Sequence, residues 1–289
     1  RGRYREFTQC DFDIVGVDSA AADFEILLLM RESFHALGIE GVTIHLSHRG
    51  VFNRALERLG IRDTGLEVLR IVDKLKKIGE PTVRSQLGKL IGETAADEVL
   101  AFGKPEKDFS TTLEKITHIA GGPAEDTERL ARIYQWMKEL EIESSYQLDP
   151  SITRGLDYYT GIVYETFLND LPEIGSVCSG GRYNDLASLY TRERLPGVGS
   201  SIGLDRLMAA LEEQGKKPQR KSVTEVLVFC LQESLYNDYH RIGHAFRKAG
   251  FSTEVFPEPK KLAAQFSFAE KKGIPLGIFL GEDEKNRGV

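Results

Sequence analysis

Hydrophobic and polar residues alternate through the first part of the chain. Residues 4–16, YREFTQCDFDIVG, follow a period of two, which predicts a half-buried β-strand. The mostly apolar face of this strand carries Thr8, Cys10, Phe12 and Ile14. The opposite face carries Phe7, Gln9, Asp11 and Asp13. Solvent exposure is the ordinary explanation for a polar strand face of this kind.

A helical period follows this strand. Apolar residues recur along one face at Ile26, Met30, Phe34 and Leu37. Asp18 and Ser19 are both candidate N-cap residues, and Asp23 falls in the first turn or just beyond it. This pattern predicts an amphipathic helix that packs on the core.

The next segment predicts a short strand, VTIHL, followed by a helix within residues 42–56. His45 and His48 lie there with no third ligand nearby, so we interpret them as structural or solvent-facing residues. Residues 59–145 are rich in helical patterns and charge, which predicts a helical insert without catalytic residues. Its last helix has an apolar stripe that consists of Leu130, Ile133, Trp136, Met137 and Leu140.

Three glycine-rich segments come after the insert. RGLDYYTGIVYETF (154–167) predicts a turn that leads into a strand, and SGGRYNDLASLY (179–190) follows it. GVGSSIGLDRLMAAL (197–211) predicts a strand or turn that leads into a helix with one apolar face, formed by Leu204, Leu207, Met208 and Leu211. The glycine spacing G-x-G-x-x-x-G lacks a surrounding βαβ unit, so it does not indicate a dinucleotide-binding fold.

The last part of the chain has a different pattern. Residues 215–224 are polar and basic with a proline, which is typical of a linker. Strands and helices alternate over residues 225–289, which predicts a small α/β domain with a mainly parallel sheet. His240 and His244 on its first helix indicate a polar helix face more than a metal site.

Composition limits the class of protein. The 289 residues suggest about two domains, and 41% apolar and 28% charged residues are typical of a soluble globular protein. No apolar run is long enough to span a membrane, and the first residues are not a signal peptide. Three separated cysteines fit a reducing compartment. The net charge of -6 does not indicate general affinity for nucleic acid, although it allows a local basic patch.

Candidate chemistry gathers in the glycine-rich segments. Arg154, Arg182 and Arg206 each lie beside flexible backbone, and guanidinium groups suit phosphate oxygens. The paired tyrosines and the polar strand face suit a small polar ligand. A surface salt bridge is the alternative for each arginine alone, but the combination favours a nucleotide together with a small molecule.

Four segments, in this order, resemble the catalytic core of the histidyl-tRNA synthetases, a family of class II aminoacyl-tRNA synthetases: GRYREFTQCDFD, RGLDYYTGIVYE, SGGRY and GVGSSIGLDRL. The first resembles the second half of class II motif 2, the second the signature peptide of the histidine enzymes, and the last motif 3. The resemblance implies an α+β fold: an antiparallel-sheet class II catalytic core with a helical insert, followed by a small α/β anticodon-binding domain.

The resemblance also implies domain limits. The catalytic core would occupy 1–58 and 146–214, the helical insertion domain 59–145, the linker 215–224 and an incomplete anticodon-binding domain 225–289. Motif 1 and the first half of motif 2 are absent from the sequence, so we expect an internal part of a longer chain that is inactive alone.

Roles for individual residues follow from the resemblance. The histidine-binding residues would be Gln9, Asp13, Arg154, Tyr158, Tyr159 and Tyr183. The ATP-binding residues would be Arg3, Phe7, Gly203 and Arg206. Asp13 would lie near the imidazole, and Phe7 and Arg206 would cover the two faces of adenine. Arg154 and Arg206 would be catalytic, with Arg154 on the α-phosphate, where negative charge grows in the transition state.

The family implies ATP as a substrate with Mg²⁺ and no resident metal. Histidine and tRNA(His) would be its other partners, and we expect a cytoplasmic homodimer that does not bind membranes. The alternative is the synthetase-like regulatory subunit of ATP phosphoribosyltransferase, which shares the fold and a YYTG-like stretch. Arg154 before GLDYY, the Gln9 and Asp13 pair, and the trailing α/β domain all favour the ligase.

Overall fold

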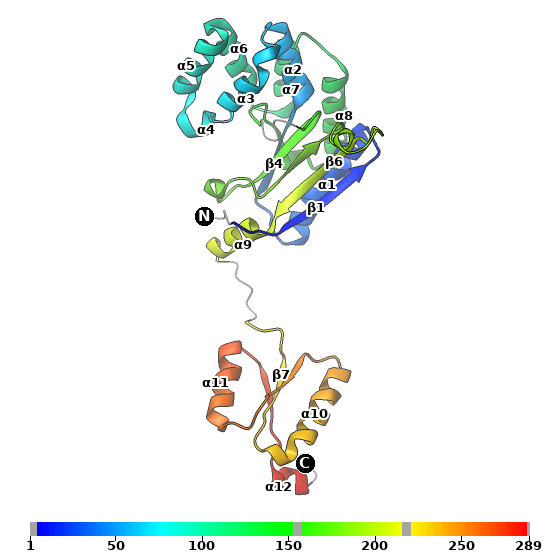
Figure 1. Cartoon of the computed structure of the whole chain (residues 1–289), viewed down its shortest axis with the longest axis vertical. Coiled ribbons are helices and arrows are strands. Elements are labelled where there is room, and N and C mark those ends of the chain that lie inside the picture. The colour runs from blue at the N-terminus through cyan, green and yellow to red at the C-terminus, as the bar shows by residue number, and fades with distance from the viewer. Residues whose placement is uncertain (1–4, 153–157, 216–220, 288–289) are drawn as a thin grey trace. The chain divides into compact units, whose positions relative to one another are not determined.

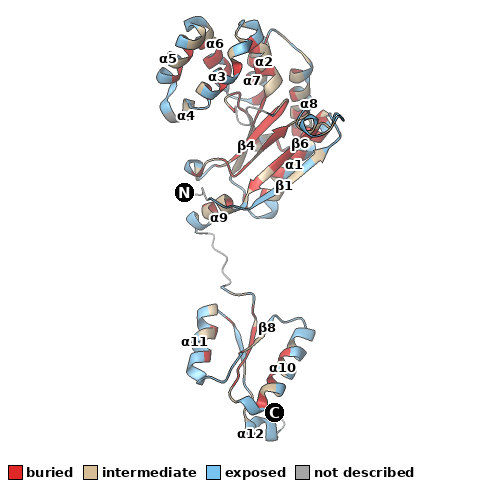
Figure 2. Ribbon diagram, in the orientation of Figure 1, coloured by how far each residue is buried: buried red, intermediate tan, exposed pale blue. Residues whose placement is uncertain are grey.

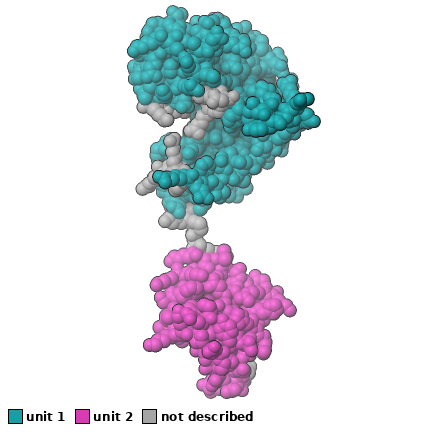
Figure 3. All heavy atoms as spheres, in the orientation of Figure 1, with its two compact units in different colours: residues 1–214 teal, residues 215–289 magenta. Residues whose placement is uncertain are grey.

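The computed structural model describes residues 5–152, 158–215 and 221–287. The chain forms two compact units, residues 1–214 and 215–289, which Figure 3 shows in two colours. Each unit has a hydrophobic core of its own.

A six-stranded sheet is the frame of the first unit (Figure 1). Its strands are β1 (Gln9–Val15), β2 (Val42–His48), β3 (Tyr146–Leu148), β4 (Ile162–Leu168), β5 (Cys178–Arg182) and β6 (Gly197–Gly203). Their order is β1-β6-β5-β4-β2-β3, and every pairing is antiparallel except that of β2 with β3. The predicted antiparallel core is therefore confirmed.

The register of the sheet decides which residues share a face. Asp13 on β1 pairs with Gly199 on β6, and Gly199 pairs with Gly181 on β5. Residues opposite one another in neighbouring strands point to the same side, so these three positions share one face. The other face of β1 carries Phe12 and Ile14, which pack against the core as predicted.

Helix α1 (Ala20–Ala36) covers the core side of the sheet and contacts β6. Ser19 is its N-cap, and the Ser19 hydroxyl accepts a hydrogen bond of 3.2 Å from the Ala22 amide. Ile26, Met30 and Phe34 are completely buried, as the period predicted. Leu37 lies just past the helix end and is 60% exposed, so the apolar stripe stops at Phe34.

Seven helices separate β2 from β3. They are α2 (Arg49–Arg58), α3 (Gly65–Val72), α4 (Leu75–Ile78), α5 (Glu80–Ile91), α6 (Glu93–Gly103), α7 (Phe109–Ile119) and α8 (Glu125–Glu139). Helices α3 to α6 lie beside α2 and α7 in Figure 1, whereas α8 packs along α1. The buried face of α8, red in Figure 2, includes Leu130, Ile133 and Met137. Leu140 is 52% exposed at the C-cap, so the predicted stripe is shorter than the sequence suggested.

Helix α9 (Leu204–Glu213) closes the first unit directly after β6. Leu207 is buried and Leu211 is partly buried against the core. Leu204 and Met208 are 43% and 39% exposed, so only part of the predicted apolar face of α9 is covered.

The second unit is a small α/β domain. Its elements are β7 (Val226–Val228), α10 (Tyr236–Lys248), β8 (Thr253–Val255), α11 (Leu262–Lys272), β9 (Leu276–Ile278) and α12 (Glu282–Arg287). The sheet is parallel with the order β8-β7-β9, which confirms the predicted alternation. The central strand β7 is fully buried, because helices cover both of its faces.

Candidate functional site

A polar site lies on the face of the sheet that carries Asp13. The phenol of Tyr183, directly after β5, donates a hydrogen bond of 2.6 Å to Asp13 Oδ1. The Tyr183 amide donates to the Gly197 carbonyl at 2.7 Å, which continues the β5–β6 pairing and fixes the tyrosine beside β1. A carboxylate and a phenol from strands distant in sequence thus meet at one point.

Two glycines of β6 make room for this pair. A Cβ atom at Gly199 would lie 1.6 Å from Asp13 Oδ1, and a Cβ atom at Gly197 would lie 2.3 Å from Tyr183 Cε2. Real side chains do not approach so closely, so any other residue at either position would displace the carboxylate or the ring. The glycines of the GVG segment therefore serve close approach rather than phosphate binding.

Tyr158 and Tyr159 form a second wall of the site. Their ring centroids are 4.3 Å apart, and Tyr159 Cδ1 is 3.1 Å from the position of a Cβ atom on Gly181. Burial raises the pKa of Tyr159, and the hydrogen bond with Tyr158 raises it further. Burial and the hydrogen bond to Asp13 likewise raise the pKa of Tyr183. Both phenols therefore stay protonated at neutral pH and can donate hydrogen bonds.

Gln9 lies on the same strand face as Asp13, near the other end of β1. Its Nε2 donates a hydrogen bond of 2.5 Å to Ser201 Oγ on β6. The side chain is exposed, so its carbonyl oxygen is available to a ligand on this face.

A third group of predicted residues gathers where β1 begins. Leu204 N donates to Thr8 O at 3.0 Å, and Thr8 N donates to Asp205 Oδ2 at 2.5 Å. These bonds tie the start of β1 to the first turn of α9. Phe7, which is 59% exposed, and Arg206 are therefore held on adjoining segments.

Arg206 and Gly203 have defined surroundings. The Arg206 guanidinium donates to the Ser176 carbonyl, just before β5, which fixes the orientation of the side chain. Gly203 is the N-cap of α9, and its amide donates to the Val177 carbonyl at 3.0 Å. Arg3 and Arg154, the other two arginines that the sequence assigned to ATP or catalysis, lie outside the described residues.

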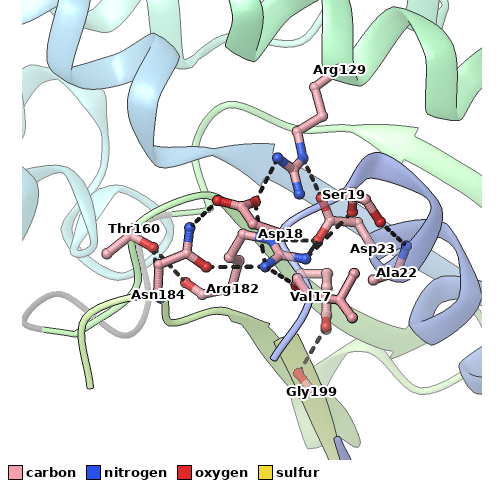
Figure 4. Close-up of polar contacts among 11 residues, drawn as sticks. Val17, Asp18, Ser19, Ala22, Asp23, Arg129, Thr160, Arg182, Asn184 and Gly199 are labelled. Carbon is pink, nitrogen blue, oxygen red and sulfur yellow. Dashed lines mark hydrogen bonds and ion pairs between the residues drawn. The ribbon is translucent and has the colours of Figure 1, made fainter. Parts of the chain in front are cut away.

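Arg182 does not have the role that its glycine-rich setting suggested. It is 1% exposed, and its guanidinium pairs with Asp23 at 2.7 Å (Figure 4). The interpretation of Arg182 as a phosphate-binding residue is wrong, and so is the alternative of a surface salt bridge. The side chain extends to the core side of β5, because Tyr183 takes the opposite face.

The two histidines of β2 are structural, as interpreted from the sequence. His45 Nδ1 lies 2.9 Å from Asp149 Oδ2, and His48 Nδ1 accepts a hydrogen bond from Gly50 N at the start of α2. Burial lowers the pKa of His48 from 6.5 to about 4. Within the part of the chain that the structure describes, no cluster of three or more His, Cys, Asp or Glu residues could hold a metal ion.

Sequence reasoning missed several residues of the site. Gly197, Gly199 and Ser201 share the face of Asp13, and their period-two spacing within the predicted strand was a readable signal. Asp23, the partner of the buried arginine, and Arg129, which also binds Asp23, gave no local signal of this cluster because they come from distant helices.

Comparisons with known proteins decide the family. The chain matches the family model of histidyl-tRNA synthetase over residues 1–207 and that of the anticodon binding domain over residues 225–289. The chain belongs to the histidyl-tRNA synthetase family. A histidine–tRNA ligase of Treponema denticola is 51% identical over 98% of this chain and 64% of its own length. The chain thus spans less than two thirds of that relative.

Solved structures agree with the family assignment. The histidyl-tRNA synthetase of Nostoc sp. PCC 7120 aligns over 99% of this chain and 69% of its own, with 31% identity and a TM-score of 0.85. A Bacillus halodurans protein described as an ATP phosphoribosyltransferase regulatory subunit/histidyl-tRNA synthetase aligns over 94% of this chain and 68% of its own, with 17% identity and a TM-score of 0.75. At that identity the second likeness shows a common fold alone.

No helix among the described ranges is long and apolar enough to cross a membrane.

Proposed function

We propose that this chain is the catalytic and anticodon-binding part of a histidine–tRNA ligase. The observation that supports it best is the contact between Asp13 and Tyr183 on the open sheet face. Tyr183 donates to Asp13 Oδ1. No hydrogen bond from the described residues reaches Asp13 Oδ2, which can therefore accept one from an imidazole N–H. A pocket that pairs polar groups rejects ligands that lack them, by roughly 10⁴-fold or more in favourable cases.

The first chemical step is the activation of histidine. Its carboxylate attacks the α-phosphorus of ATP, the bond to the β-phosphate oxygen breaks, and pyrophosphate leaves as histidyl-adenylate forms. A carboxylate is already a nucleophile, so positioning rather than proton transfer supplies most of the rate increase. Arg154 would hold the α-phosphate and stabilise the charge that grows there, which makes it the central catalytic residue.

ATP would bind where β1 meets α9. The exposed ring of Phe7 can stack on adenine, and Arg206 can cover the other face and reach the terminal phosphates. Gly203 would allow the nucleotide close to the backbone, and Arg3 would lie near the phosphates. Mg²⁺ would enter with ATP.

The second step transfers histidine from the adenylate to the terminal ribose of tRNA(His) and releases AMP. The unit that matches the anticodon binding domain would contact the anticodon. We further propose that the whole protein acts as a homodimer in the cytoplasm, with the histidine contacts completed by residues outside this chain.

A charging assay with the full-length protein tests this function. Labelled histidine should become attached to tRNA when ATP is present, and tRNA whose terminal ribose has been oxidised with periodate should accept none. A synthetase-like regulatory subunit would bind histidine without charging any tRNA. Histidine binding with no charging would therefore overturn the proposal.

A further inference from the structure

Arg182 is a buried cation at the junction of three segments. Its Nε donates to Asp23 Oδ1 on α1 at 2.7 Å, and its Nη1 donates to the Val17 carbonyl at 3.0 Å. Its Nη2 donates to the Ser19 carbonyl at 3.4 Å. The guanidinium therefore fixes the path of the chain between the end of β1 and the start of α1 (Figure 4).

The same arginine is tied to the segment that carries the paired tyrosines. Its carbonyl accepts a hydrogen bond of 2.8 Å from the Thr160 amide. The side-chain oxygen of Asn184, Oδ1, accepts a hydrogen bond of 3.0 Å from Arg182 Nη1. The backbone amide of Asn184 donates a hydrogen bond of 3.0 Å to Thr160 Oγ1. The position of Thr160, next to Tyr158 and Tyr159, is thus set by residues on either side of Tyr183.

A second arginine joins the cluster from α8. Arg129 donates to Asp23 Oδ2 at 2.5 Å and to Asp18 Oδ1 at 2.9 Å. The side-chain Nδ2 of Asn184 donates a hydrogen bond of 2.8 Å to Asp18 Oδ2. Burial raises the pKa of Asp23, and the two guanidinium groups oppose that shift. Both arginines therefore favour the charged form of the carboxylate.

Three segments that the cluster joins carry residues of the proposed histidine pocket. Asp13 lies on β1, four residues before Val17, and Tyr158 and Tyr159 directly precede Thr160. Tyr183 is the neighbour of Arg182 and points to the opposite face. A buried ion pair adds little net stability on average, because desolvation offsets the attraction. Its geometry, however, limits where the attached backbone can lie.

We propose that Arg182, with Asp23, Arg129, Asn184 and Thr160, is a positioning network for the histidine pocket. The network lies on the core side of the sheet and does not contact the substrate. It fixes the positions of Asp13, the paired tyrosines and Tyr183 relative to one another. The inference rests on the proposed function, because it concerns the affinity of the same pocket for histidine.

Thr160→Val is the first test. It removes the hydroxyl that accepts the hydrogen bond from the Asn184 backbone amide, and it keeps the shape of the side chain. The variant also loses the longer hydrogen bond of 3.4 Å from Thr160 Oγ1 to the Arg182 carbonyl. The KM for histidine in ATP–pyrophosphate exchange by the full-length protein should rise about fivefold or more, since one lost hydrogen bond typically accounts for about fivefold. The KM for ATP should stay within about twofold of its wild-type value. Thr160→Ser restores the hydroxyl and should restore the KM for histidine.

Arg182→Lys tests the centre of the network, with Arg54→Lys as a matched control. Arg54 and Arg182 both line a cavity of about 320 Å³. The hydrogen-bond partners of Arg54 are Asp126, at 2.9 Å, and the carbonyls of Ala120 and Gly122, and these partners lie outside the histidine-pocket segments. Arg182→Lys should raise the KM for histidine about tenfold or more. Arg54→Lys should lower thermal stability without changing that KM.

A double variant shows whether Arg182 acts through Tyr183. Removal of the phenol hydroxyl in Tyr183→Phe should raise the KM for histidine. The double variant combines Arg182→Lys with Tyr183→Phe. If the network positions the Tyr183 hydroxyl, the increase in the KM for histidine in the double variant should be smaller than the product of the two single increases. Independent, multiplicative effects would overturn the proposal.

The outcomes separate the two proposals. Wild-type exchange that does not depend on histidine would reject the proposed function, and the network inference would fail with it. Normal wild-type exchange with an unchanged KM for histidine in Thr160→Val and Arg182→Lys would reject the network alone. Equal increases in the KM for histidine and ATP would also reject it, because they would indicate general loss of structure.

Discussion

Asp13 illustrates how a single carboxylate can serve both structure and recognition. Its Oδ1 accepts the Tyr183 phenol, and Gly199 beneath it leaves the space that the carboxylate occupies. The remaining oxygen lies on an exposed strand face, where a ligand can reach it. Recognition of an imidazole would therefore depend on the negative charge at this position.

Asp13→Asn should weaken histidine binding while the fold persists. A hydrogen bond to a charged group contributes roughly 1.5–3 kcal/mol, so the KM for histidine should rise about 10- to 100-fold. Asp11→Asn, two residues away on the same exposed strand face, is the control and should change the KM less than twofold, which is about 0.4 kcal/mol. Steady-state exchange kinetics would measure both, and equal effects would exclude Asp13 as the imidazole partner.

Gly199→Ala should abolish histidine binding. The added Cβ would lie 1.6 Å from Asp13 Oδ1, so the carboxylate must move away from Tyr183. Gly103→Ala, at a position with no atom within 4 Å of the added methyl group, should leave activity unchanged. Isothermal titration with histidine compares the two, and retained affinity in Gly199→Ala would contradict the position of Asp13.

His48 should make stability depend on pH. Burial lowers the pKa of His48 in the folded protein to about 4, whereas the unfolded chain has the ordinary value of 6.5. The unfolded state then binds the extra proton between these values, so the stabilising contribution is complete above pH 6.5 and is lost as the pH falls toward 4. The loss should reach a few kcal/mol.

Urea unfolding of wild type and His48→Gln between pH 5 and pH 8 measures this contribution. The wild-type protein should lose more stability than the variant as the pH falls. Parallel pH profiles would show that His48 does not titrate differently in the two states.

At the scale of elements, the period of apolar residues predicted which segments form helices and strands. It predicted less well how much of each apolar face other parts of the protein bury. The strand β1, the helix α1 with its Ser19 cap, and the parallel sheet of the second unit follow from local patterns. Leu140 and Met208 are exposed although they continue apolar stripes, because burial depends on which neighbour lies opposite. A periodic pattern carries no information about that neighbour.

Ile133→Ala on α8 should destabilise the first unit by about 2–5 kcal/mol, since the side chain is completely buried. Leu140→Ala should change stability by less than about 0.5 kcal/mol, because that side chain is 52% exposed. Thermal or urea unfolding measures both free energies. A loss at Leu140 as large as that at Ile133 would show that another surface covers the helix end.

At the scale of the whole molecule, the site depends on segments that only the fold brings together. The polar face of Gln9 and Asp13 was readable from alternation, and its ligand was inferred from the family resemblance. Arg182 was misinterpreted because its partner Asp23 is 159 positions away, so no local pattern identifies the pair. The sequence shows that an arginine is present, and tertiary contacts decide whether it faces phosphate or carboxylate.

ATP–pyrophosphate exchange by the full-length protein, with each amino acid in turn, is the most direct test of histidine activation at this site. We predict exchange with histidine and with no other amino acid, and its loss in Arg154→Ala while histidine still binds. Absence of exchange with histidine would contradict the proposed reaction. Unchanged exchange in Arg154→Ala would contradict the proposed role of that arginine.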